Sequence, residues 1–70
     1  MNLQYKQFFG IAILDTNDGI WYGKVIGYYL PDGTTCNISD VITFQSTDIT
    51  HLKHEMSISV DEYLDMLINQ

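Results

Sequence analysis

The chain is short and acidic. It has 70 residues, with three lysines and no arginine against nine carboxylates, which gives a formal net charge of −6 with neutral histidines. The apolar share of 46% is enough for one small folded domain and argues against a disordered acidic tail. The length argues against a multidomain enzyme, and three cations are too few to neutralise the phosphates of a nucleic acid. We therefore treat residues 1–70 as a single domain.

The first half of the chain has the pattern of antiparallel strands. Residues 5–15 and 20–29 are rich in aromatic and β-branched side chains, and the Asp-Gly pair at residues 18–19 is a hairpin signal. Gly23 and Gly27 interrupt the second strand. Because glycine inside a strand marks a bulge or a close approach of backbone, we expect this strand to bend.

The middle of the chain predicts a turn and a shorter third strand. Pro31-Asp32-Gly33 has turn chemistry and tips a hairpin extension, with residues 34–38 as its return arm. A polar connection leads to the third strand at residues 41–45.

A single helix ends the chain. From residue 49 onward the apolar residues recur in steps of three and four, which predicts an amphipathic helix over residues 49–69 with Asp48 or Thr47 as its N-cap. Such a helix is about 31 Å long and a ten-residue strand about 34 Å, so the two match in length. The predicted fold is of the α+β class: a three-stranded antiparallel sheet packed on one long C-terminal helix, in the order β-β-β-α.

Three motifs occur along the chain in a fixed order. They are Trp-Tyr-Gly-Lys-Val-Ile-Gly at residues 21–27, Asp-Val-Ile-Thr-Phe-Gln at 40–45, and Ser-Val-Asp-Glu-Tyr-Leu at 59–64. Together they resemble the HicB family of antitoxins, and the resemblance covers residues 5–67.

The resemblance implies a partial ribonuclease-H-like fold without a working nuclease site. It also implies binding to HicA, a small basic ribonuclease that HicB proteins block. This sequence differs from the family pattern by extra residues at about 28–39. It also has no segment corresponding to the family's C-terminal DNA-binding element, so we expect no separate DNA-binding domain and no direct contact with nucleic acid.

No constellation of residues predicts catalysis, a metal or a cofactor. The carboxylates Asp15, Asp18 and Asp40 fit turns and strand ends, where they hydrogen-bond to backbone. His51 and His54 lie three residues apart, as expected for a solvated helix flank. The single cysteine, Cys36, has no partner for a disulfide and no neighbouring cation that would lower its pKa. Together, Cys36, His51 and His54 match no known spacing of zinc ligands.

The distribution of acidic and aromatic residues predicts interaction surfaces. Carboxylates gather near the helix C-terminus, where the helix dipole prefers cations, so a use other than stability is indicated. The turn carboxylates add to the same negative field if they lie at the same end of the sheet. The residues expected to bind a partner are Asp15, Asp18, Trp21, Tyr22, Asp32, Asp61, Glu62 and Asp65.

Consecutive aromatic pairs place one ring of each pair on either face of the sheet, and a single helix covers only one face. Exposed aromatic surface indicates an interface, and self-association is a common way for a small chain to bury more surface. We therefore expect a homodimer, with contacts from Tyr28, Tyr29 and Ile58.

The sequence thus predicts a non-enzymatic, HicB-like inhibitor that binds and occludes a basic RNA-degrading toxin or nuclease. The alternative is a phage or mobile-element inhibitor, similar to an anti-CRISPR protein, that blocks a nucleic-acid-binding defence complex. The start of the chain lacks signal-peptide features, and the longest apolar run, residues 11–14, is far below the ~20 residues of a membrane span. We expect a cytoplasmic location, in the bacterium or, for a phage-encoded protein, in its host.

Overall fold

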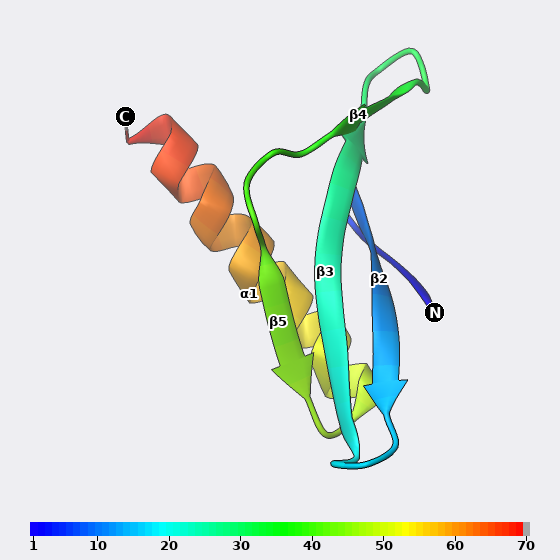
Figure 1. Cartoon of the computed structure of the whole chain (residues 1–70). Coiled ribbons are helices and arrows are strands. Elements are labelled where there is room, and N and C mark those ends of the chain that lie inside the picture. The colour runs from blue at the N-terminus through cyan, green and yellow to red at the C-terminus, as the bar shows by residue number, and fades with distance from the viewer. Residues whose placement is uncertain (70) are drawn as a thin grey trace.

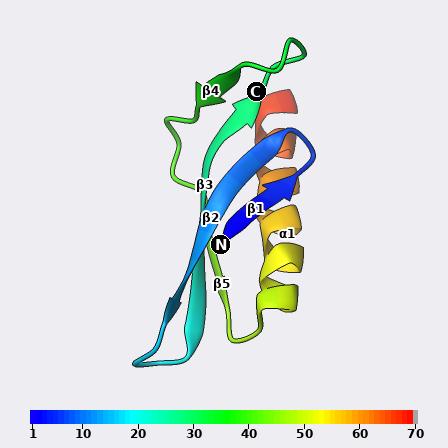
Figure 2. The same ribbon diagram turned by 90° about the vertical axis from the view of Figure 1, so that its right-hand side faces the viewer.

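The computed structural model describes residues 1–69 and has two layers, an antiparallel sheet and one helix (Figure 1, Figure 2). This confirms the predicted α+β class with a single long C-terminal helix. The elements in chain order are β1 (Asn2–Tyr5), β2 (Phe8–Asp15), β3 (Ile20–Tyr29), β4 (Thr35–Asn37), β5 (Thr43–Ser46) and α1 (Ile49–Ile68).

Strand β3 is the centre of the sheet. Strand β2 pairs along one side of it, from Phe8 opposite Tyr28 to Asp15 opposite Ile20, and β1 pairs with the outer side of β2. On the other side of β3, β4 pairs with its C-terminal end and β5 with its N-terminal half. Every pairing is antiparallel.

The sheet has five strands, so the prediction of three was wrong in number. The segment predicted as one strand, residues 5–15, is folded back at Lys6, whose φ is 53°. Residues other than glycine rarely adopt this left-handed backbone conformation, which hairpin loops of two residues require. Lysine and glutamine are not typical of such turns, so the sequence at Lys6 and Gln7 does not predict one. The predicted return arm, residues 34–38, is confirmed as β4, and the strand predicted at 41–45 begins two residues later as β5.

The expected irregularity of β3 is confirmed. Phe9 lies opposite Gly27 but Gly10 lies opposite Val25, so Ile26 is an extra residue and forms a bulge. The carbonyl of Cys36 on β4 approaches Gly27 so closely that a Cβ atom would overlap it. The glycine therefore permits β4 to pair with the end of β3.

The helix covers one face of the sheet. Asp48 is the N-cap, and its Oδ1 accepts hydrogen bonds from the backbone N–H groups of Thr50 (2.7 Å) and His51 (3.2 Å). Three residues of the predicted apolar stripe are fully buried, namely Leu52, Met56 and Val60. They pack against buried sheet residues and the segment before β5: Leu3, Phe8, Ala12, Val25, Ile42 and Phe44.

Candidate functional site

The aromatic side chains of β3 divide between the two faces, as predicted. Trp21 and Tyr28 lie on the helix-facing side, where they are partly buried against the core, and the Tyr28 ring centroid is 5.8 Å from that of Phe8. Tyr22 and Tyr29 lie on the opposite side and are 41% and 42% exposed. Of the predicted aromatic contacts, only this second pair is presented on the uncovered face of the sheet.

That uncovered face carries apolar side chains that no element among residues 1–69 covers. Ile13 is 63% and Ile11 37% exposed, and the rings of Phe9 and Tyr29 on the same face pack against each other at a tilt, with centroids 5.0 Å apart. We call Phe9, Ile11, Ile13, Tyr22 and Tyr29 the open-face patch. Part of it lines a shallow depression of about 520 Å³ that extends to Thr43 and Gln45 on β5.

Asp15, the last residue of β2, and Asp18, in the β2–β3 turn, lie at one end of the open-face patch. Asp18 accepts hydrogen bonds from the Ile20 N–H (2.9 Å) and from the Tyr22 hydroxyl (2.7 Å), and Asp15 accepts one from the Asn17 N–H (2.9 Å). The hydrogen bond to Asp18 raises the pKa of Tyr22. These carboxylates therefore order the turn and also place negative charge beside an exposed aromatic ring.

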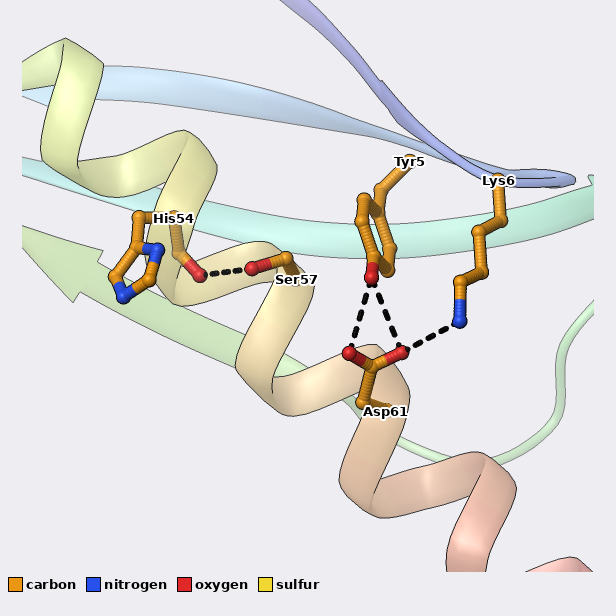
Figure 3. A network of polar contacts seen from close by, with 5 residues as sticks. All are labelled: Tyr5, Lys6, His54, Ser57 and Asp61. Atoms are coloured by element: carbon orange, nitrogen blue, oxygen red, sulfur yellow. Dashed lines mark hydrogen bonds and ion pairs between the residues drawn. The ribbon is translucent and has the colours of Figure 1, made fainter.

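Asp61 is engaged within the molecule. Its carboxylate accepts hydrogen bonds from the Tyr5 hydroxyl (3.0 and 3.2 Å) and pairs with the Lys6 ammonium at 2.9 Å, as Figure 3 shows. These contacts lower the pKa of Asp61, Lys6 first and Tyr5 second, and hydrogen bonding to Asp61 raises the pKa of Lys6. Asp61 thus ties the β1–β2 turn to the helix. In the same view the Ser57 hydroxyl bonds back to the His54 carbonyl within the helix.

We expect Asp61→Asn to lower the melting temperature by a small amount, well below the effect of a core truncation. Because the folded state lowers the pKa of Asp61, its contribution to stability is present above the ordinary aspartate pKa of about 3.9 and is lost as the pH falls below it. The variant and the natural chain should therefore differ most at pH 7, less so in high salt, and the difference should shrink as the pH falls through the lowered pKa of Asp61. Thermal melts across this range, with Asp65→Asn as the matched control, measure the effect. A difference that persists unchanged at low pH would contradict it.

Glu62 and Asp65 are exposed and form no salt bridge within residues 1–69. Glu62 borders a groove of about 490 Å³ between the second half of α1 and the segment that leads into β5. We call this the helix-end groove. Hydrogen bonding to Asp40, together with burial, raises the pKa of Tyr63 inside it. Its lining residues are Asp40, Val41, Ile42, Thr43, Ser59, Glu62, Tyr63, Met66 and Leu67.

The predicted acidic residues do not form one field. The β2–β3 turn, with Asp15 and Asp18, lies at the end of the molecule where α1 begins, whereas Asp32 lies beyond the opposite end of β3 (Figure 2). A ten-residue strand separates the two turns by about 33 Å, more than three Debye lengths at physiological salt. The expectation of a common negative end was wrong for these turns. Asp32 accepts hydrogen bonds from the Thr34 N–H (3.0 Å) and hydroxyl (2.6 Å), which lower its pKa and close its own turn.

The three residues predicted as oligomer contacts point in different directions. Tyr29 is in the open-face patch, Tyr28 packs toward the helix, and Ile58 is 40% exposed on the outer side of α1, away from Met56 and Val60. One flat contact with a partner cannot include all three.

Within residues 1–69, no three His, Cys, Asp or Glu side chains are grouped closely enough to hold a metal ion. The His51 Nε2 atom lies 3.0 Å from Glu55 Oε1, and the ring centroids of His51 and His54 are 5.8 Å apart. No helix in this described part is long and apolar enough to cross a membrane. Comparison of the chain with family models, with curated proteins and with solved structures gives no match.

Proposed function

We propose that this chain is a non-enzymatic inhibitor of the HicB type, located in the cytoplasm, which binds a basic RNA-degrading toxin or nuclease and occludes its nucleic-acid site. The observation that carries the proposal is the helix-end groove. Its lining combines the apolar side chains of Val41, Met66 and Leu67 with the carboxylates of Asp40 and Glu62, and no lysine among residues 1–69 lines it.

The groove has the composition of a protein interface. Val41, Met66 and Leu67 are 77%, 61% and 48% exposed, which is unusual for three large apolar side chains that lie together. Interfaces commonly combine an apolar centre with a charged rim. A lysine or arginine of a basic partner can lay its aliphatic stem over Met66 and Leu67 and place its cation beside Glu62.

The family motifs also support this location. Residues 40–45 supply Asp40 and Val41 on one wall, and residues 59–64 supply Ser59, Glu62 and Tyr63 on the other. The remaining motif, residues 21–27, lies in β3, which pairs with β5 and packs against α1. Two of the three segments that carry the resemblance thus meet at the groove, and the third supports them from the neighbouring strand. The net charge of −6 adds a long-range attraction for a basic protein.

The test is a calorimetric titration of this chain with a purified, basic, HicA-like toxin, together with an RNA-cleavage assay. We expect Glu62→Gln to weaken binding by about fivefold to tenfold, mainly through slower association at low salt, and Met66→Lys by more than about tenfold. Glu55→Gln is the matched control, since it makes the same charge change on the same helix outside the groove, and it should change affinity by less than about twofold.

Absence of binding at micromolar concentrations to any such toxin would overturn the proposal, as would equal affinities for the Glu62→Gln and Glu55→Gln variants. The same titration against a nucleic-acid-binding defence complex tests the alternative target. Binding to that complex alone, weakened by the groove variants, would replace the toxin as the partner.

A further inference from the structure

The uncovered face of the sheet has an ordered arrangement of charges. Successive rows across β2 and β3 on this face are Asp15–Ile20, Ile13–Tyr22 and Ile11–Lys24. The apolar Ile13–Tyr22 row is therefore flanked by a carboxylate on one side and an ammonium on the other. Lys24 is exposed and forms no salt bridge within residues 1–69, and the Asp15 turn contact uses only Oδ1.

We propose that a second copy of this chain packs on the open-face patch, sheet against sheet, about a two-fold axis that passes through the Ile13–Tyr22 row. This axis lies midway between the two facing sheets and is perpendicular to the strands. The rows of the second copy therefore follow one another in the opposite direction to those of the first. The Asp15–Ile20 row of one copy then lies over the Ile11–Lys24 row of the other. Each copy supplies one carboxylate and one ammonium, so the contact is self-complementary and contains two Asp15–Lys24 pairs.

The arrangement of charges favours a second copy of the chain on the open-face patch, although each chain is acidic overall. Most carboxylates lie on α1 or in loops. On the open face the negative charge of Asp15 and Asp18 lies at one end and the positive charge of Lys24 two rows away, so reversing the row order brings opposite charges together. Within one chain Asp15 and Lys24 are two rows apart, about 13 Å along the strands, too far to pair. At the usual sheet separation of about 10 Å, a lysine side chain from one copy reaches the aspartate of the other.

The overlap about this axis is small, so the dimer is weak. The sheets overlap from the Asp15–Ile20 row to the Ile11–Lys24 row, about 13 Å along the strands, and Phe9 and Tyr29 lie outside the overlap. Three strand positions about 4.8 Å apart give a flat area on the order of 200 Å² per copy. Two copies stay below the lower limit of about 1,200 Å² for a stable interface, so we expect a dissociation constant near the millimolar range. The helix-end groove shares Thr43 with the depression on the open face, but its other lining residues lie outside that depression, so the dimer does not depend on the proposed function.

Sedimentation velocity across a micromolar to millimolar concentration series tests the contact. The 8.1 kDa chain is expected to shift to twice its mass. Lys24→Glu alone and Asp15→Lys alone should each weaken the dimer by more than about tenfold, and the double variant should recover it, because both pairs are re-formed with reversed charge. Lys53→Glu, on the exposed side of α1, is the matched control and should leave the dimer unchanged.

Ile13→Asp is a second variant, which should abolish the dimer by burying a charge at the axis; circular dichroism confirms that each variant is folded. A monomer at every concentration overturns the proposal. So does a dimer that survives both Ile13→Asp and Lys24→Glu, since it must use another surface. A double variant that stays monomeric while both single variants dissociate overturns the two-fold geometry.

Discussion

Leu52→Ala is expected to leave most of the chain unfolded at 25 °C. The Leu52 side chain is fully buried between the helix and the sheet, so truncation removes its apolar contacts and leaves a cavity. Such substitutions cost about 2–5 kcal/mol. A domain of this size has a total stability of only about 3–5 kcal/mol, so the loss is comparable with the whole.

Urea denaturation followed by far-ultraviolet circular dichroism measures this change. Ile58→Ala, at an exposed position of the same helix, is the matched control and should shift the free energy of unfolding by about 0.5 kcal/mol or less. Similar losses for Leu52 and Ile58 would mean that the helix packs on the sheet through a different face.

Gly10→Ala is expected to lower the free energy of unfolding by about 3 kcal/mol or more, the upper end of the range for overpacked cores. A Cβ atom at Gly10 would overlap the carbonyl oxygen of Lys24 and lie 3.1 Å from the Val25 Cα. Both neighbours are backbone, so no side-chain rotation relieves the clash, and β2 must move away from β3 beside the bulge.

The midpoint of guanidinium denaturation reports the effect, and amide hydrogen exchange in β2 and β3 locates it. Asn2→Ala, on the adjacent strand and exposed, is the control. A stable Gly10→Ala variant with protected amides on both strands would show that the close approach of the two backbones is not required.

The regular periodicities in the sequence predicted the fold class and the core. Period two across residues 20–29 placed Tyr22 and Trp21 on opposite faces, and steps of three and four placed Leu52, Met56 and Val60 on one stripe of the helix. Both patterns follow from backbone geometry alone, so tertiary context does not change them. The aspartate N-cap was predictable for the same reason, since its hydrogen bonds are local.

The first hairpin was not predictable, because its turn lacks the residues that favour a positive φ. Lys6 adopts that conformation where its ammonium reaches Asp61, and Tyr5 bonds to the same carboxylate. A contact between residues 55 positions apart stabilises the turn, and nothing in the local sequence carries that information. The intramolecular role of Asp61 was missed for the same reason.

The separation of the acidic turns follows from the length of β3. Asp18 precedes and Asp32 follows one ten-residue strand, so the two must lie at opposite ends of it. The helix begins after β5, which runs antiparallel to β3 and ends near the Asp18 turn. Topology therefore directs Glu62 and Asp65 away from that turn. The helix-end groove itself depends on side-chain packing between distant segments, and no local pattern predicts it.

The order of strand pairing has a consequence for how the protein is assembled over time. Strands β1, β2 and β3 each pair with the next strand along the chain through a short loop. Strand β5 instead pairs with β3, past the intervening β4, and α1 packs on the completed sheet. We expect the hairpins to form within about 1–10 μs and the β5–α1 segment to close last, because its loop entropy is the largest. The two walls of the helix-end groove, residues 40–43 and α1, belong to this late-closing part of the chain, so the groove is the last surface to form.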